Sequence, residues 1–257
     1  MSGVQIPSSL MFLSKLKPLK NFQKGKKNHA GRNNTGRITV RHRGGGHKRV
    51  TKKINLNLIN GKALVINLEY CSNRNAFLMR VFNNNKFYYM IAPKNIELFD
   101  NFSLNNENIN FDNGSLNLLK SLPIGVLINN LECRPKSGGI FIKSAGTFGK
   151  ILYQDLKYTA ILLPSGESRL LLNTCTANIG VISNDNFFNF KRYKAGESRW
   201  LNKRPSVRGV AMNPIDHPHG GGQGKTSGGR PSVSPWAKLT KGKKTRLTKN
   251  KFVLKSL

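Results

Sequence analysis

The chain has 257 residues, and its 43 Lys and Arg against 11 Asp and Glu give a formal net charge of +32. Self-repulsion at that charge opposes a compact fold, which disfavours an enzyme acting alone and indicates a polyanionic partner, most commonly nucleic acid. Hydrophobic residues make up 38% of the chain, so ordered and unordered parts should coexist.

The rest of the composition disfavours several kinds of site and location. Cys71, Cys133 and Cys175 lie far apart without a CxxC pair, which argues against a disulfide framework and a structural zinc site. No stretch approaches the roughly 20 apolar residues that a membrane helix needs. The basic start of the chain has too short an apolar run, residues 10–13, for a secretory signal.

The charge is unevenly distributed along the chain. Residues 1–60 hold 14 Lys and Arg and no acidic residue, and the first acidic residue is Glu69. Residues 61–190 hold 12 basic and 9 acidic residues, whereas residues 191–257 hold 17 basic and 2 acidic. We therefore expect a nearly neutral folded middle between two basic segments, which would stay extended in free solution because they cannot bury enough apolar surface.

Apolar residues in the middle alternate with period two, which predicts strands. The first set is expected at residues 54–59, 63–70, 76–82 and 86–91. After an irregular, Asn-dominated stretch at 100–114, the second set is expected at residues 125–131, 139–144, 149–154, 158–163, 168–173 and 177–182. Short strands in two sets favour two small closed barrels, and a single β-sandwich over 54–183 is the alternative.

The N-terminal basic segment contains GRNNTGRITVRHRGGGHKR at residues 31–49. If residues 37–43 are extended, the guanidinium groups of Arg37, Arg41 and Arg43 lie along one edge at about 7 Å spacing, close to the spacing of phosphates along a strand. The three glycines at 44–46 would let the backbone approach a phosphodiester closely. A flexible glycine linker is the alternative.

The C-terminal basic segment contains RPSVRGVAMNPIDHPHGGGQGK at residues 204–225 and TSGGRPSVSPWAKLTKGKKTR at 226–246. Five prolines in these two runs forbid a long helix. His217 and His219 flank a proline, and we expect their imidazoles to donate hydrogen bonds to RNA or to stack on a base.

Three enzymatic readings of this segment are disfavoured. GKT at 224–226 resembles part of a phosphate-binding loop, but His219 stands where that motif needs glycine and no strand precedes it. A metal site would need ligands beyond Asp216, His217 and His219. A general acid or base at His217 or His219 is chemically feasible, but no pattern of nucleophile and base accompanies it.

Seven segments of the chain form a recognisable series. They are GRNNTGRITVRHRGGGHKR (31–49), LEYCSNR (68–74), APK (92–94), RPKSGGIFIKSAGTF (134–148), LPSGE (163–167), RPSVRGVAMNPIDHPHGGGQGKTSGGRPSVSPW (204–236) and TKGKKTR (240–246). In order and spacing they resemble the family of the second protein of the large ribosomal subunit, and the run MNPIDHPHGGG is highly specific to it.

The resemblance implies a mainly β architecture with four parts. These are a basic N-terminal extension at 1–35, an oligonucleotide-binding (OB) barrel at 36–118, an SH3-like barrel at 119–192, and a basic C-terminal extension embedded in ribosomal RNA (rRNA) at 193–257.

The resemblance also implies the function. Proteins of this family bind large-subunit rRNA near the peptidyl transferase centre and support subunit association, tRNA binding and translation. The implied partners are rRNA, neighbouring large-subunit proteins, the small subunit through an intersubunit bridge, and tRNA indirectly, with no membrane. No enzymatic activity and no cofactor are implied, and Mg²⁺ or K⁺ would be bound mainly by the rRNA. An RNA-processing enzyme or a free RNA chaperone that uses the His217/His219 loop is the alternative.

The residues expected to contact rRNA lie in both basic segments. They are Arg32, Arg37, Arg41, Arg43, Gly44, Gly45, Gly46, His47, Lys48, Arg49, Arg204, Arg208, Asn213, His217, His219, Gly220, Gly221, Gly222, Lys225, Arg230, Trp236, Lys241, Lys243, Lys244 and Arg246.

Two positions depart from the family pattern, and they are Gln223 in place of a usual Glu and Cys71 in place of a usual Asp. The region from Lys225 to Arg246 looks most like the mitochondrial and alphaproteobacterial branch, and abundant Asn, Lys, Ile and Phe fit an AT-rich organellar genome. We therefore expect the mitochondrial matrix, with bacterial cytoplasm or plastid as the alternative.

Overall fold

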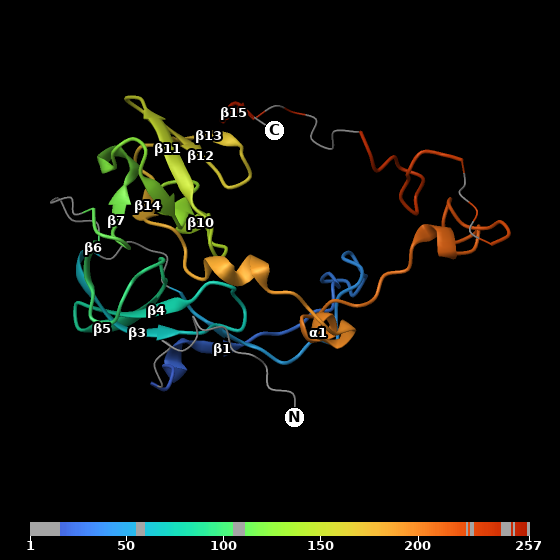
Figure 1. Cartoon of the computed structure of the whole chain (residues 1–257), viewed down its shortest axis with the longest axis horizontal. Helices are drawn as coiled ribbons and strands as arrows, with labels where there is room; N and C mark the ends of the chain where they lie inside the picture. Colours follow the sequence, from blue (N-terminus) through green and yellow to red (C-terminus); the bar gives the residue numbers. More distant parts are fainter. Residues whose placement is uncertain are drawn as a thin grey trace. The chain divides into compact units, whose positions relative to one another are not determined.

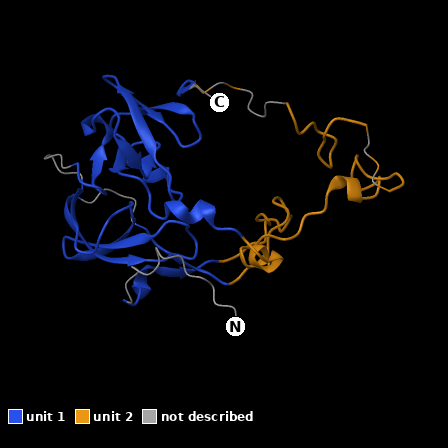
Figure 2. Cartoon of the chain, in the orientation of Figure 1, with its two compact units in different colours: residues 1–26, 48–191, 251–257 blue, residues 27–47, 192–250 orange. Residues whose placement is uncertain are grey.

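The computed structural model describes residues 16–54, 60–104, 111–224, 226, 229–242, 248 and 250–255. Figure 2 shows that the chain divides into two compact units. Unit 1 comprises residues 1–26, 48–191 and 251–257, and unit 2 comprises residues 27–47 and 192–250. We call residues 27–47 the N-terminal arm and residues 192–250 the C-terminal arm.

The first half of unit 1 is an antiparallel meander (Figure 1). It contains β3 (Gly61–Glu69), β4 (Leu78–Asn83) and β5 (Lys86–Ile91), with β6 (Asn101–Leu104) on the other edge of β3. Along β3, from Ala63 on, every second residue is buried, as expected for a strand with one face on a core. Asn84 and Asn85, both with positive φ, form the two-residue turn between β4 and β5.

The second half of unit 1 consists of short strands. They are β7 (Leu116–Leu118), β8 (Leu127–Asn129), β9 (Leu131–Glu132), β10 (Gly139–Phe141), β11 (Gly149–Gln154), β12 (Tyr158–Leu162), β13 (Ser168–Leu172), β14 (Thr176–Ile179) and, from the far end of the chain, β15 (Val253–Lys255). β1 (Gln23–Gly25) and β2 (Val50–Lys52) form a separate antiparallel ribbon, as do β9 and β10.

One hydrogen-bonded ladder of eleven strands runs through both halves of unit 1, in the order β15-β13-β12-β11-β8-β14-β7-β6-β3-β4-β5. Among the described residues, the ladder passes from one half to the other where β6 and β7 pair in parallel, at Leu104 and Leu116. The described residues also contain a short α-helix, α1 (Ala195–Trp200), and 3-10 turns at η2 (Lys20–Phe22), η3 (Leu119–Ser121), η4 (Asp185–Asn189) and η5 (Gly209–Ala211).

The apolar core of unit 1 is divided in the same way as its strands. One cluster takes its buried residues from 119–179, including Leu131, Ile151 and Ile161. A second takes them from 63–116, including Val65 and Phe102. A third, smaller cluster combines residues of both halves. Each half thus buries apolar side chains of its own, which is the main source of its stability.

The predicted mainly β fold class is confirmed. Most predicted strands overlap an observed one, with ends displaced by a few residues. The prediction at 54–59 lies, except for its first residue, outside the described residues. The Asn-dominated stretch predicted to be irregular contains β6, and β1, β2, β7 and β15 have no predicted counterpart. Apart from β6, these strands are three residues long, too short for a periodic signal, and partners distant in sequence hold them.

The three cysteines form no disulfide, and Cys71 and Cys175 are buried. Burial, together with the nearby Glu132 carboxylate, raises the pKa of the Cys175 thiol to about 11. Among the described residues, no helix is long and apolar enough to span a bilayer.

Candidate nucleic-acid interface

Unit 2 concentrates positive charge that it cannot neutralise internally. It contains 19 Lys and Arg but only two acidic residues, Glu197 and Asp216. Even if both carboxylates were paired, most of the cations would need a partner from outside. Arg37, Arg41 and Arg43 are indeed exposed. Such an excess attracts phosphate, and Arg suits it best because its guanidinium can donate two parallel hydrogen bonds.

The two arms join each other through the backbone, although more than 140 residues separate them in sequence. Within the described residues, four contacts between main-chain atoms link them: the bridge of Arg43 with Lys203, and hydrogen bonds from Arg204 to His42, from Gly44 to Asn202 and from His47 to Trp200. In these last three pairs the N–H donor lies 3.0–3.3 Å from the carbonyl oxygen. The arms are therefore built into one unit and are not two independent tails.

The glycine triplet of the N-terminal arm packs against the end of α1. A Cβ on Gly45 would lie 2.8 Å from Nη2 of Arg199, and a Cβ on Gly46 would lie 2.8 Å from Cβ of Asn202. We expected these glycines to let the backbone approach a phosphodiester. In the structure they let it approach Arg199 and Asn202 of the protein itself. Sequence reasoning missed Arg199 and Asn202, because nothing near them signals that they pack on a segment so far away in the chain.

Residues 37–43 do not form the extended strand considered above. The Asn33 side chain accepts hydrogen bonds from the N–H groups of Thr35 and Arg37, both at 3.0 Å. This tight turn brings Ile38 into a bridge with Arg32, and His42 has a φ of 59°. The three arginines remain exposed, but local side-chain hydrogen bonding has replaced the regular spacing along one edge.

His217 and His219 form a self-contained pair in the C-terminal arm. Their ring centroids lie 4.7 Å apart. Nδ1 of His217 accepts the N–H of His219 at 3.0 Å, and Nε2 of His219 accepts the N–H of Val233 at 3.2 Å. Each imidazole thus uses one of its two ring nitrogens as the acceptor of a backbone N–H.

The burial of His217, which is 7% exposed, limits what this pair can do. A Cβ on Gly209 would lie only 2.5 Å from two atoms of the ring, so a glycine is needed there. Donation to RNA, one of the two predicted roles, can use only the second ring nitrogen of each imidazole, because the first one accepts a backbone N–H. The contacts observed instead shape the loop between Met212 and Val233.

Arg41 and Trp236 link the N-terminal arm to the later part of the C-terminal arm. The guanidinium carbon of Arg41 lies 4.9 Å from the ring centroid of Trp236, within range of a cation–π contact. The Trp236 side chain is nevertheless 68% exposed. The structure thus brings together two residues that were predicted separately from the two basic segments.

Gly220, Gly221 and Gly222 pack closely against Asn213, Pro214 and Thr226 of the same arm. The remaining predicted residues fall into three groups. Exposed side chains are those of Arg32, His47, Lys48, Arg204, Arg208, Asn213, Arg230 and Lys241. Arg49 is partly buried, and its Nη1 donates to the carbonyl of Ser72 at 3.1 Å; Lys48 and Arg49 belong to unit 1. Lys225, Lys243, Lys244 and Arg246 lie outside the described residues. Within the described part of the chain, no group of His, Cys, Asp and Glu could hold a metal ion.

The chain combines a mainly β body with a highly cationic unit, which contains exposed arginines, glycine turns and an exposed tryptophan. These features define a nucleic-acid-binding protein. Models of two protein families match the chain: "Ribosomal Proteins L2, RNA binding N-terminal domain" at residues 19–101 and "Ribosomal Proteins L2, C-terminal domain" at residues 112–237.

Several curated proteins are similar to the chain over nearly its whole length. Large ribosomal subunit protein uL2 of Methylorubrum extorquens is 44% identical over 250 residues, 95% of this chain and 90% of that protein. The protein of the same name from a Wolbachia of Brugia malayi is 46% identical over 243 residues, 93% and 88% of the two chains. Large ribosomal subunit protein uL2m of Reclinomonas americana is 46% identical over 253 residues, 97% and 90%.

The chain belongs to the uL2 family of large-subunit ribosomal proteins. It is therefore a structural, rRNA-binding component of the ribosome and not an enzyme.

Proposed function

We propose that unit 2 is the main rRNA-binding surface of this protein. The observation that carries the proposal is the imbalance of 19 cationic against two acidic residues in a unit whose backbone is already organised. The residues assigned to rRNA contact above, from Arg32 to Arg49 and from Arg204 to Arg246, make these contacts. Arg37, Arg41 and Arg43 bind phosphates, and the exposed face of Trp236 stacks on a base.

The position within the ribosome follows the family resemblance. The loop that contains His217 and His219 lies near the peptidyl transferase centre and supports the shape of the surrounding rRNA without taking part in chemistry. The protein thereby supports tRNA binding indirectly, and it aids subunit association through a bridge to the small subunit. Neighbouring large-subunit proteins are its protein contacts.

The domain boundaries follow the separate cores of unit 1. An OB barrel at 36–118 surrounds the core that includes Val65 and Phe102, and an SH3-like barrel at 119–192 surrounds the core that includes Leu131 and Ile161. The extensions at 1–35 and 193–257 are basic and follow the rRNA. The internal burial of each half supports two barrels over a single sandwich.

The compartment is the mitochondrial matrix, and the protein is of the mitochondrial type. Support comes from the Asn-rich composition and from the similarity to uL2m of Reclinomonas americana, although the bacterial relatives are as similar. Co-sedimentation with large subunits from purified mitochondria tests this assignment. Recovery only with cytoplasmic or plastid ribosomes would refute it.

Salt titration of the purified protein on large-subunit rRNA tests the binding surface. Each phosphate contact releases condensed counterions, so the affinity should fall steeply as salt rises. In the triple variant Arg37→Gln, Arg41→Gln and Arg43→Gln, the slope of log affinity against log salt should decrease by up to about 3.

A matched variant removes the same charge from unit 1. Lys62, Lys86 and Lys150 are exposed on its strands, and changing all three to Gln should leave the slope nearly unchanged. An equal loss of slope in both triple variants, or a flat salt response of the unchanged protein, would refute the proposal.

A further inference from the structure

Glu69, the only acidic residue before Glu97, is buried in a strongly cationic protein. It ends strand β3, and it is only 5% exposed. A buried carboxylate is costly unless it is paired and hydrogen-bonded, and a carboxylate in an RNA-binding protein also opposes the phosphates. Its presence therefore needs a reason within the fold.

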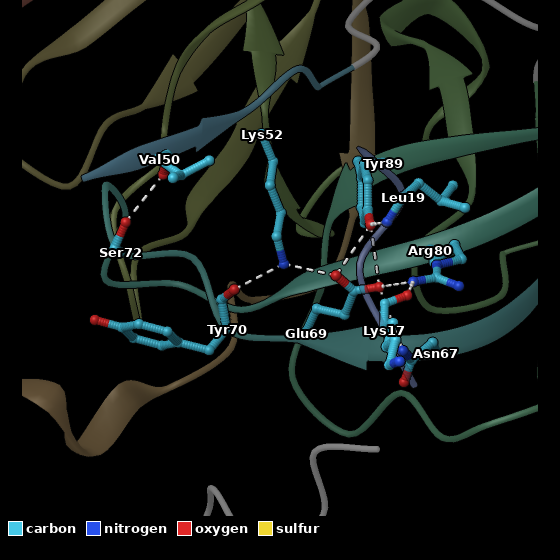
Figure 3. Close-up of polar contacts among 10 residues, drawn as sticks. All are labelled: Lys17, Leu19, Val50, Lys52, Asn67, Glu69, Tyr70, Ser72, Arg80 and Tyr89. Atoms are coloured by element: carbon cyan, nitrogen blue, oxygen red, sulfur yellow. Dashed lines mark hydrogen bonds and ion pairs between the residues drawn. The ribbon is translucent and has the colours of Figure 1, made fainter. Parts of the chain in front are cut away.

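Four donors surround this carboxylate (Figure 3), and Asn67 Nδ2, 3.3 Å from Oε1, is the most distant of them. Lys52 Nζ donates to Oε2 at 2.6 Å, Arg80 Nη2 donates to Oε1, and the hydroxyl of Tyr89 lies 3.0 and 3.1 Å from the two oxygens. The side chains of Lys52 and Arg80 are themselves only 9% and 8% exposed. Burial by itself raises the pKa of Glu69, but these contacts outweigh it and hold the pKa below its ordinary value of 4.5.

Two of these side chains, Arg80 and Tyr89, also form hydrogen bonds with the backbone of residues 17–22, the segment that leads into the N-terminal arm. Arg80 Nη2 also donates to the carbonyl of Lys17 at 2.8 Å. The Tyr89 hydroxyl accepts the N–H of Leu19 at 3.1 Å, and the ring of Phe22 packs edge-on against the Tyr89 ring at 5.8 Å. Glu69 is thus connected to residues 17–22 through one intervening side chain, that of Arg80 or that of Tyr89.

Lys52 connects Glu69 to the segment that leaves the arm. It lies in β2, which pairs with β1 so that Lys52 faces Gln23 and Val50 faces Gly25. The ribbon is extended by a hydrogen bond from the N–H of Lys53 to the carbonyl of Phe22 at 2.7 Å and by one from the N–H of Lys26 to the carbonyl of Arg49 at 2.9 Å. The N-terminal arm, residues 27–47, is the loop between these two strands.

We infer that Glu69 is a positioning residue for rRNA binding. It fixes both ends of the N-terminal arm, residues 17–22 through Arg80 and Tyr89 and strand β2 through Lys52, so that the exposed arginines of the arm are presented from a rigid base. This inference rests on the proposed rRNA-binding function of unit 2.

The substitution Glu69→Gln separates this role from a simple effect of charge. The variant gains one net positive charge, so electrostatics alone would leave rRNA affinity unchanged or tighten it. Positioning predicts the opposite result, because Lys52 and Arg80 lose their ionic partner and the ribbon detaches. We expect affinity for large-subunit rRNA to fall about tenfold, a change of 1.4 kcal/mol.

Glu97→Gln is the matched control, because Glu97 is exposed and the charge change is the same. Its affinity should be unchanged or slightly higher. Hydrogen exchange supplies the structural readout. In Glu69→Gln, the amides of Leu19, Lys26 and Lys53 should lose protection, whereas those of β4 and β5 should keep it. Cross-links from rRNA to residues 27–47 should weaken more than those to residues 192–242.

Tyr89→Phe covers the case in which Glu69→Gln does not fold. It retains the buried ring but removes the hydroxyl that joins Glu69 to Leu19, and we expect about a threefold loss of affinity by the same mechanism. Two results would overturn the inference. One is a Tyr89→Phe variant in which both the protection of Leu19 and the rRNA affinity are unchanged. The other is a Glu69→Gln variant that binds rRNA as tightly as Glu97→Gln. If the unchanged protein shows no salt-dependent rRNA binding, the proposed function itself fails.

Discussion

At the scale of single residues, the two histidines of the C-terminal arm illustrate how hydrogen-bond direction limits function. His217 and His219 each use one ring nitrogen to accept a backbone N–H. A general base needs a ring nitrogen that is open to substrate, and in each of these rings one nitrogen is already occupied by a backbone N–H. The pair therefore supports the shape of the loop, which agrees with a ribosomal protein that carries out no chemistry.

This arrangement predicts graded effects at His219. His219→Ala removes the acceptor of the Val233 N–H, and an unsatisfied donor costs about 1–3 kcal/mol of local stability. His219→Gln retains a side-chain acceptor and should lose less. Hydrogen exchange at the Val233 amide measures both variants, and ribosomes that carry them should translate more slowly but not stop. Complete loss of peptide bond formation in assembled ribosomes would contradict the structural role.

At the scale of elements, strand β15 closes the C-terminal arm. Val253 and Lys255 face Arg169 and Ser168 of β13. Figure 1 labels both strands. The ring of Phe252 packs 5.9 Å from that of Tyr158. The C-terminal arm thus leaves unit 1 after residue 191 and returns to it at residue 251.

Truncation after residue 249 tests the importance of this closure. The shortened chain retains the residues of unit 2 that we propose to bind rRNA but releases one end of the arm, which must then be ordered at a greater entropic cost. We expect weaker binding to large-subunit rRNA and faster hydrogen exchange in β13. Phe252→Ala should reproduce part of the effect, about 1 kcal/mol from the lost ring contact. Binding equal to that of the full chain would show that the anchor contributes nothing.

The sequence predicted the longer strands because alternation is a local signal. The burial of every second residue in β3 from Ala63 on can be inferred from the pattern alone, as can the turn at Asn84 and Asn85. It could not predict β15 or the ribbon of β1 and β2, since these three-residue strands exist only through partners brought by the tertiary fold. The Glu69 network was missed for the same reason, although Glu69 was noticeable as the first acid of the chain.

At the scale of the whole molecule, the sequence predicted the location of the charge but not the state of the basic segments. Composition correctly separates a nearly neutral middle from two cationic ends. It led us to expect extended arms, whereas the backbone of the N-terminal arm pairs with that of the C-terminal arm at Arg43 and Lys203. Pairing between segments so distant in sequence leaves no trace in the local pattern, and motif resemblance predicted rRNA-binding residues without showing the contacts that they make within the protein.

The excess charge of unit 2 predicts that a polyanion stabilises it. Mutual repulsion among 19 cations should make residues 27–47 and 192–250 the first to be cut by proteinase K, which does not depend on basic residues. Large-subunit rRNA or heparin should slow this cleavage at least several-fold and have little effect on unit 1. Equal protection of both units, or none, would contradict this expectation.

The anchoring of the C-terminal arm at both ends has a consequence for the order of ribosome assembly. A free tail can be threaded past folded RNA from its tip, but a segment tied at both ends cannot. We therefore expect the C-terminal arm to contact its rRNA before β15 pairs with β13. Pairing of β15 with β13 would then be a late step of assembly, which fixes the far end of the arm on unit 1.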